Sequence, residues 1–327
     1  MNNRRKLVVA LGAGALAAPF GTFAQQQRKV WRIGLLSSEN PSGYMTRIEA
    51  LRAGLRDFGY EEGKNLVIEF RWADGKLDRL PELAAELVRL NVDFLVTHAS
   101  APARAAKQAT TTIPIIMAAT ADPVALGLVT SLAQPGGNIT GSSFFITELA
   151  AKRIELLKDA FPRITQVAVF VQPENPSSNI TLQSMKAAAR SLNVTLHEFP
   201  VSGLHEFDGA FAAMVKSRVG AVAVPELAMF LAHPKKIADL AAKQRLPVIG
   251  NSDLAEVGGL IGYGSNLLDL WHRVGYFVDK IVKGTRPGVI PVEQPTRFDL
   301  VINMKTAKTL GIKIPNSILV HATKVIE

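Results

Sequence analysis

Short apolar segments and amphipathic helical patterns alternate along the chain from Val30 onward, and this alternation restricts the possible folds more than any other feature. The expected strands occupy residues 30–37, 66–71, 92–97, 113–117, 167–171, 194–199, 219–224, 247–250, 260–263 and 298–302. One helical pattern begins at Ile48 and stops before Gly59, and a second runs from Leu80 to Leu90. Strands that alternate with helices predict parallel, doubly wound α/β sheets.

The alternating pattern is duplicated. The tetrapeptide Glu-Asn-Pro-Ser follows the first expected strand at 39–42 and follows another strand at 174–177, 135 residues later. The segments 112–116 and 245–249 resemble each other at an offset of 133 residues. At 327 residues the chain is long enough for two cores. We therefore expect two doubly wound parallel-sheet lobes joined by a hinge.

Two such lobes predict where a ligand binds. Open parallel sheets bind ligands beyond the carboxyl ends of their strands, where helix N-termini direct free N–H groups. Lobes that face each other form a cleft lined by these loops, and Tyr44 and Phe144 are the aromatic residues expected to stack on a planar ligand. The full set of candidate ligand-binding residues is Ser38, Tyr44, Ser100, Thr120, Asp122, Thr140, Phe144, Asn175, Glu226, Asn251 and Asp253.

Asp122 and Pro123 follow the apolar segment 113–117. Asp is a favoured helix N-cap and Pro a favoured first helical residue, so the pair predicts a helix that begins at Pro123 and ends at Gly136 and Gly137. A second interpretation is that the Asp122 carboxylate faces the cleft and meets an ammonium or hydroxyl group. Both interpretations can hold together.

The sequence gives no support for catalysis, a metal or a cofactor. The six histidines show no i, i+4 pair and no HExxH motif, and GxSxG and Walker motifs are absent. Residues 7–17 imitate a dinucleotide-binding fingerprint but lack the acidic residue that would hold a ribose. His98 is the one histidine at a strand end, and a structural or solvated role is favoured there. We expect a protein that is not an enzyme.

The first 24 residues read as a secretory signal peptide. Arg4, Arg5 and Lys6 precede the apolar run 7–18, and small residues before Gln25 offer a cleavage site near Ala24. Both Sec and twin-arginine export fit, and the run is shorter than the roughly 20 residues of a membrane span. Three of the nine net positive charges lie in this segment, and the other six are spread along the chain rather than gathered in a nucleic-acid-binding patch. We expect an exported protein without disulfides, because the chain has no cysteine.

Several longer motifs resemble the ABC transporter substrate-binding protein family that includes bacterial tryptophan- and tyrosine-binding proteins. The motifs are GGLIGYGSN at 258–266, VDKIVKG at 278–284, PVEQPTRF at 291–298, LVINMKTAK at 300–308, DPV at 122–124 and QPGGNITG at 134–141. They span essentially the whole mature chain.

This resemblance implies a type I periplasmic-binding fold with three crossovers. It divides the chain into a signal peptide at 1–24, an N-terminal lobe at 29–143 plus 258–291, and a C-terminal lobe at 144–257 plus 292–327. It also implies that the stretch from Asp122 to Thr140 borders the ligand pocket.

The resemblance further implies a periplasmic, monomeric solute receptor that closes on a small molecule and passes it to an ABC permease in the inner membrane. An aromatic or branched amino acid, or a related aromatic carboxylate, is the expected ligand, and nucleic acid is not an expected partner. Two alternatives stay open: a periplasmic sensing partner of a membrane receptor, and an exported hydrolase or isomerase that uses the same cleft.

Overall fold

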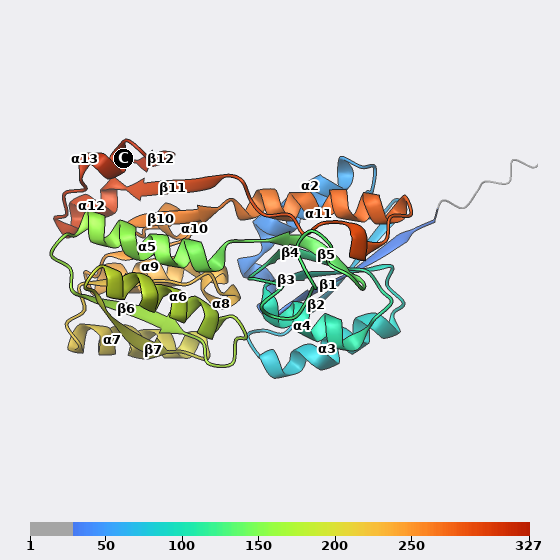
Figure 1. The fold of residues 1–327 in the computed structure, drawn as a ribbon, viewed down its shortest axis with the longest axis horizontal. Helices are drawn as coiled ribbons and strands as arrows, with labels where there is room; N and C mark the ends of the chain where they lie inside the picture. The colour runs from blue at the N-terminus through green and yellow to red at the C-terminus, as the bar shows by residue number, and fades with distance from the viewer. Residues whose placement is uncertain (1–28) are drawn as a thin grey trace, which may run out of the picture. The chain divides into compact units, whose positions relative to one another are not determined.

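Two β-sheets, each covered by helices on both faces, organise residues 31–327 (Figure 1). The computed structural model describes residues 29–327, so the expected signal peptide at 1–24 lies outside the described residues. Residues Trp31–Glu327 form one compact unit that contains both sheets. The predicted α/β architecture of two doubly wound lobes is confirmed.

The first sheet has five parallel strands in the order β2-β1-β3-β4-β5. One face packs against α2 and α11 through residues such as Leu51 and Trp271, and the other packs against α3 and α4 through Leu87 and Ala106. The elements of this lobe are β1 (Trp31–Ser37), η1 (Pro41–Gly43), α2 (Met45–Arg56), β2 (Leu66–Trp72), η2 (Leu77–Arg79), α3 (Leu80–Arg89), β3 (Phe94–His98), α4 (Ser100–Ala109), β4 (Ile115–Thr120), β5 (Ile139–Ser143), α11 (Leu267–Val282) and η4 (Pro287–Val289).

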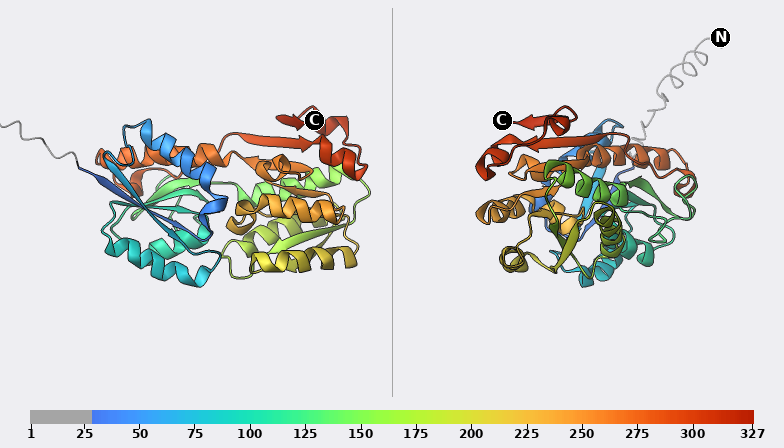
Figure 2. Two further views of the ribbon diagram at one scale, coloured as in Figure 1. Left: turned by 180° about the vertical axis from the view of Figure 1, so that it is seen from behind. Right: turned by 60° about the vertical axis from the view of Figure 1, so that its left-hand side comes forward.

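The second sheet has seven strands in the order β12-β11-β10-β9-β8-β6-β7. Helices α7 and α9, yellow and orange in the rear view of Figure 2, cover one face, and α5 and α6 cover the other. The elements are α5 (Ile146–Ala160), β6 (Gln166–Val171), α6 (Ser178–Ser191), β7 (Thr195–Pro200), η3 (Leu204–Glu206), α7 (Phe207–Lys216), β8 (Ala221–Ala223), α8 (Ala228–Ala232), α9 (Pro234–Lys243), β9 (Val248–Gly250), α10 (Ser252–Glu256), β10 (Ile261–Ser265), β11 (Phe298–Asn303), α12 (Met304–Leu310), α13 (Asn316–Leu319) and β12 (Lys324–Ile326).

The chain passes between the two sheets three times, after β5, after β10 and just before β11. Strand β10 pairs with β9 in the second sheet, so the expected assignment of residues 258–265 to the first lobe is wrong. The last crossing lies slightly later than the expected boundary at residue 292, because Val292 still packs in the core of the first lobe and Glu293 bridges to Ser142. The crossings therefore lie close to residues 144, 266 and 294.

One strand pair departs from the expected parallel sheet. Strand β11 runs antiparallel to β10. Strand β10 runs toward the first lobe and the chain leaves the second sheet at Ser265. Because the chain returns from the first lobe at the same edge, the returning strand β11 must run away from that edge. The short β12 then pairs parallel to β11 and was not expected.

The helix expected after Pro123 does not form. Residues 123–129 make successive turns, in which the Pro123 carbonyl accepts hydrogen bonds from the Leu128 and Val129 N–H groups. Gly127 has a φ of +64°, which interrupts a right-handed helix. Asp122 keeps a capping role, because its Oδ1 accepts a hydrogen bond of 3.0 Å from the Ala125 N–H. The carboxylate therefore caps a turn instead of a helix.

Strand β5 was not among the strands expected from the sequence. Its Gly141 has a φ of +128°, and a Cβ at this position would lie 2.3 Å from the Met117 carbonyl oxygen. The pairing of β4 with β5 shifts register after Met117. Glycine is therefore required where two strand backbones approach each other, and Gly141 marks an irregularity within a strand rather than the end of one.

Candidate functional site

The carboxyl ends of the strands of both sheets meet between the lobes. The Ser177 hydroxyl, at the start of α6 in the second lobe, donates a hydrogen bond of 2.5 Å to the Ser100 hydroxyl at the start of α4 in the first lobe. His233 Nε2 lies 3.7 Å from a carboxylate oxygen of Glu39 across the same gap. These contacts identify the loops after the strands as the facing surfaces of a closed cleft.

Arg47 connects the two lobes through hydrogen bonds. It is the third residue of α2, and its side chain is almost fully buried. It donates to the Gly43 carbonyl of its own lobe, and to the Leu231 carbonyl and the Asp253 carboxylate of the other lobe at 3.1 and 3.0 Å. A Cβ on Gly43 would lie 2.6 Å from the Ala232 carbonyl oxygen, so the backbones of η1 and α8 are in close contact.

Polar side chains are buried along both edges of the cleft. From the first lobe come Ser37, Ser38, Glu39, Arg47, Thr97, His98, Ser100 and Thr120, and from the second come Gln172, Asn175, Ser177, Glu226, Asn251 and Ser265. Burying polar groups costs free energy unless they are hydrogen-bonded. Such a concentration at the edge of two parallel sheets is typical of a ligand site.

The structure brings most of the sequence-predicted residues to this cleft. Ser38, Ser100, Thr120, Asn175, Glu226 and Asn251 are buried at strand ends, and Asp253 contacts the other lobe through Arg47. Of the four remaining predicted residues, Asp122 caps a turn, as described above, and Tyr44, Thr140 and Phe144 are described next.

Thr140 and Phe144 take structural roles. The Thr140 hydroxyl, in the first half of β5, donates a hydrogen bond of 2.8 Å to the Ile290 carbonyl within the first lobe. Phe144 packs in an apolar cluster that also contains Phe170 and Phe230 of the second lobe. The expectation that Phe144 stacks on a ligand therefore has no support from its contacts, and the ring instead joins the lobes near the first crossing.

Tyr44 is fully buried and forms part of an aromatic wall. Its ring lies 5.7 to 5.9 Å from Trp271 and Trp72, and its hydroxyl is 2.9 Å from Nδ1 of His98. Burial raises the pKa of the Tyr44 hydroxyl well above its ordinary value, so the phenol is neutral. Tyr44 therefore packs in the core of the first lobe next to the cleft, and its hydroxyl positions His98.

Burial, together with the positive charge of Arg47, lowers the pKa of His98 well below its ordinary value. The imidazole is therefore neutral. When Tyr44 donates its proton to Nδ1, the other nitrogen, Nε2, carries a proton and acts as a donor. No residue within 29–327 hydrogen-bonds to that nitrogen or to the indole N–H of Trp271, whose ring lies 5.3 Å away.

The turn that leads into α4 is strained. Ala99 has a φ of +66° and a ψ of 175°, a region that almost only glycine occupies and that costs about 1–3 kcal/mol. The Ala99 N–H is tied to the Ala119 carbonyl at 2.8 Å, which holds this backbone in place. The strained turn brings the start of α4, with Ser100, to the cleft opposite the start of α6.

Glu226 and Arg153 form a buried ion pair in the second lobe. Arg153 Nη2 lies 2.6 Å from Glu226 Oε1, and both side chains are almost completely inaccessible to solvent. Burial raises the pKa of Glu226, against the opposing effect of Arg153. Within the described residues, both carboxylate oxygens of Glu226, Asn251 Nδ2 and Thr120 Oγ1 are buried and have no hydrogen-bond partner.

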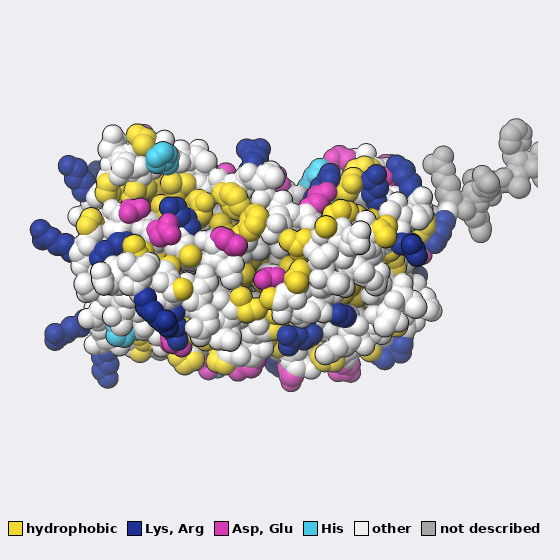
Figure 3. All heavy atoms as spheres, in the orientation of Figure 1, with side chains coloured by type: hydrophobic (Ala, Val, Ile, Leu, Met, Phe, Trp, Pro, Cys, Tyr) yellow, Lys and Arg dark blue, Asp and Glu magenta, His cyan; other side chains and the backbone are white. Residues whose placement is uncertain are grey.

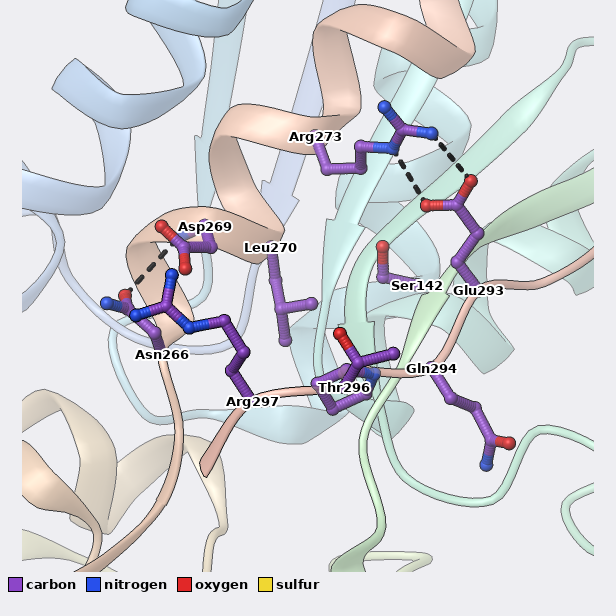
Figure 4. Close-up of a pocket in the computed structure, with 10 residues that line it drawn as sticks. Ser142, Asn266, Asp269, Leu270, Arg273, Glu293, Gln294, Thr296 and Arg297 are labelled. Atoms are coloured by element: carbon purple, nitrogen blue, oxygen red, sulfur yellow. Dashed lines mark hydrogen bonds and ion pairs between the residues drawn. The ribbon is translucent and has the colours of Figure 1, made fainter. Parts of the chain in front are cut away.

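The three chain crossings enclose a separate cavity of about 180 Å³ (Figure 4). Arg273 of α11 donates two hydrogen bonds of 2.8 Å to the Glu293 carboxylate, which connects the helix to the third crossing. Ser142 and Asn266 contribute to the lining from the other two crossings. The cavity therefore belongs to the hinge.

A larger cavity of about 380 Å³ lies at the opposite side of the cleft. It is lined by Glu39 and Lys76 from loops of the first lobe, and by Ser202, Met229 and His233 from the second. These loops follow or neighbour the strands farthest from the crossings, so the cavity lies at the mouth of the cleft.

The candidate ligand-binding residues predicted from the sequence did not include Arg47, His98, Arg153 or Ser177. His98 and Ser177 carried a usable signal, because both lie at the carboxyl ends of expected strands, and Ser177 belongs to the duplicated Glu-Asn-Pro-Ser motif. Arg47 and Arg153 lie within helices, at positions where a charged side chain is expected to face solvent. Only the contact between the lobes, or the packing of α5 on β10, buries them.

Residues 29–327 contain neither a candidate metal-binding cluster nor a candidate membrane-spanning helix. No cluster of three or more His, Cys, Asp or Glu side chains is arranged to hold a metal ion in this part of the chain. None of its helices combines the length and apolar character needed to cross a bilayer. Basic and acidic side chains are interspersed on the face shown in Figure 3.

Two doubly wound lobes, three crossings and a polar cleft at the strand ends define a type I periplasmic-binding fold. A family model described as ABC transporter substrate binding protein matches residues 38–326. The chain therefore belongs to this family, whose members bind small molecules and interact with a permease, and the resemblance noted in the sequence is confirmed.

The chain is also similar to individual proteins. A tyrosine-binding protein of Clostridioides difficile is 28% identical over 260 residues, which cover 79% of this chain and 74% of the relative. A Streptococcus pneumoniae domain solved in complex with L-Trp superposes with a TM-score of 0.83 at 28% identity, covering 90% of this chain and 99% of that one. A conserved domain protein of Vibrio cholerae gives a TM-score of 0.85 at 28% identity, covering 91% and 100%.

Proposed function

We propose that this substrate-binding protein serves an ABC importer, that it closes on a small molecule between its lobes, and that it works as a monomer in the periplasm. The observation that carries the proposal is the set of buried, unpartnered polar atoms on both sides of the closed cleft. A ligand that fills their hydrogen-bonding capacity offsets the cost of burying them. Closure by a hinge then makes affinity depend on contacts from both lobes.

The ligand class is an amino acid with an aromatic or branched side chain, or a related aromatic carboxylate. Two helix N-termini, those of α4 and α6, approach each other where Ser100 and Ser177 meet. Both ends carry a partial positive charge, and an anionic group between them relieves their repulsion. A ligand carboxylate that replaces the Ser177–Ser100 hydrogen bond and accepts from both hydroxyls satisfies this requirement, and the two relatives that bind tyrosine and L-Trp support the ligand class.

The protein returns its ligand unchanged. His98 is held neutral by burial, and its Nδ1 is occupied by Tyr44, so it suits hydrogen bonding rather than proton transfer. Mass spectrometry of an amino acid recovered after long incubation tests this point. A modified product would contradict the proposal and favour a hydrolase or isomerase.

A thermal-shift screen of amino acids and aromatic acids tests the ligand class. A ligand at 100 times its Kd adds about 2.7 kcal/mol to the free energy of unfolding, which raises the Tm by several degrees. A screen in which no compound raises the Tm would overturn the ligand class.

A matched pair of variants links the shift to the cleft. Thr120→Val removes a buried hydroxyl that is unpartnered in the closed cleft, and Thr140→Val removes one that is bonded within the first lobe. We expect Thr120→Val to reduce ligand affinity about 10-fold, as for a lost hydrogen bond. Thr140→Val should lower the Tm of the free protein but keep the ligand-induced shift. If the ligand raises the Tm of both variants equally, the ligand does not contact Thr120 and binds elsewhere.

A further inference from the structure

Glu226 is a buried acid with one oxygen in an ion pair and the other without any partner among residues 29–327. It follows the carboxyl end of β8, at the end of the second sheet that faces the first lobe. Oε1 forms an ion pair with Arg153 Nη2 at 2.6 Å, and neither Oε1 nor Oε2 has a hydrogen-bond partner among residues 29–327. An ionised carboxylate buried in this way is unfavourable unless a further donor reaches it.

The surrounding residues fix the orientation of this carboxylate. Arg153 donates from Nε and Nη2 to the Tyr263 carbonyl at 2.8 and 2.6 Å, so its guanidinium is anchored to β10. A Cβ on Gly264 would lie 2.7 Å from Glu226 Oε1 and 3.1 Å from Arg153 Nη2. The glycine therefore leaves room for the ion pair beneath β10, and Arg153 holds Oε1 so that Oε2 remains available.

The charges of the cleft favour a ligand without net charge. Buried Arg47 and Arg153 balance buried Glu39 and Glu226, and Asp253, which is half exposed, adds a further negative charge beside Arg47. An anion that lacks a compensating positive group would add to this surplus of negative charge in the closed site. A zwitterion adds no net charge.

The other acid considered for an ammonium group is less suitable. Oδ1 of Asp122 already accepts the Ala125 N–H, and its side chain belongs to a turn beyond β4. Glu226 is more deeply buried and has a free oxygen.

We propose that Glu226 is the specificity-determining residue that receives the ammonium group of the ligand at Oε2, and that Arg153 is the positioning residue that holds Oε1. The inference rests on the proposed binding of an amino acid or aromatic carboxylate in the cleft. It narrows that class to molecules that carry both an ammonium and a carboxylate group. The Glu226 carboxylate contacts the amine, and the helix N-termini at Ser100 and Ser177 contact the carboxylate.

Calorimetric titration with paired probes tests the assignment. The pairs are L-tryptophan with indole-3-propionate and L-tyrosine with 3-(4-hydroxyphenyl)propionate, because each pair differs only in the amine. The wild-type protein should bind an amino acid about 10- to 100-fold more tightly than its deaminated partner. Glu226→Gln should lose that preference, through weaker binding of the amino acid and unchanged binding of the deaminated acid.

Glu155→Gln serves as the control, since Glu155 lies on the same helix as Arg153 but is exposed and paired with Lys152. It should keep the wild-type preference. The assignment is overturned if the wild-type protein binds both members of a pair equally, or if Glu226→Gln weakens both equally while its circular dichroism is native. If Glu226→Gln does not fold, the preference of the wild-type protein decides. Wild-type protein that binds neither member contradicts the proposed ligand class itself.

Discussion

His98 shows how a single buried residue couples the cleft to pH. Its folded pKa is lowered, so the folded state resists protonation that the unfolded chain accepts below its ordinary pKa of about 6.5. The stability contributed by neutral His98 is therefore fully present above about pH 6.5 and is lost as the pH falls toward the folded pKa. Tyr44 and Arg47 are the titratable groups that face it most closely.

We predict that the free energy of unfolding of the wild-type protein falls below pH 6.5 with a slope of at most about 1.4 kcal/mol per pH unit from this residue. His98→Gln should remove this component of the slope, whereas His321→Gln, at an exposed position, should leave it unchanged. Urea denaturation at a series of pH values measures both. Identical slopes in the wild-type protein and His98→Gln would show that His98 is not held neutral.

At the level of residues, the sequence located those that end strands and missed those that reach the cleft from helices. Ser100 and Asn175 were predictable because the alternation of strands and helices places strand ends, and strand ends of parallel sheets face ligands. Arg153 was not predictable, since its burial depends on the Tyr263 carbonyl of a strand more than one hundred residues later. Tyr44 was expected to stack on a ligand, whereas its ring is buried and its hydroxyl contacts His98, which only the tertiary structure brings near.

Helices α2 and α11 meet through a pair of glycines. A Cβ on Gly54 would lie 1.8 Å from the His272 carbonyl oxygen, and a Cβ on Gly275 would lie 2.0 Å from the Gly54 carbonyl oxygen. The two helix backbones are thus in direct contact, and α11 is fixed to the first lobe although its neighbours in sequence belong to the second. This contact explains why α11 contains a glycine within a helix, where it is otherwise unfavourable.

We predict that Gly54→Ala lowers the free energy of unfolding by about 1–3 kcal/mol, because the added methyl group must push the two backbones apart. Gly209→Ala in α7 is the matched control: a Cβ there meets nothing within 4 Å, so the substitution should stabilise the helix by up to about 1 kcal/mol. Thermal unfolding of both variants measures the difference. A Gly54→Ala protein as stable as the wild type would show that the helices do not pack this closely.

At the level of elements, the alternating pattern predicted the ten expected strands with small errors at their ends, and it failed where the backbone departs from regular structure. Strand β5 contains Gly141, which looks like a turn residue but serves a close approach to Met117. The turns after Asp122 look like a helix start because Asp and Pro favour both structures. The antiparallel β11 follows from a return across the hinge, which no local pattern encodes.

For the whole molecule, Arg47 connects the two lobes when the cleft is closed. We predict that Arg47→Ala lowers ligand affinity about 10-fold, because it removes charged hydrogen bonds to Leu231 and Asp253 that exist only in the closed form. The dissociation rate should rise more than the association rate falls. Stopped-flow fluorescence with L-tryptophan or L-tyrosine measures both rates.

Arg52→Ala on the same helix is the control. Arg52 pairs with Glu49 and Glu62 within the first lobe, so its loss should leave both rates unchanged. Equal effects of the two substitutions would mean that closure does not depend on Arg47.

The central claim is that a small molecule is bound between the strand ends of the two sheets. A crystal structure of the mature protein with whichever of L-tryptophan or L-tyrosine gives the larger thermal shift tests it most directly. We predict electron density for the amino acid in the cleft, with its carboxylate at the hydroxyls of Ser100 and Ser177, its ammonium group at Glu226 and the lobes closed. Density for the ligand on an outer surface, or at the hinge cavity beside Arg273 and Glu293, would contradict the account.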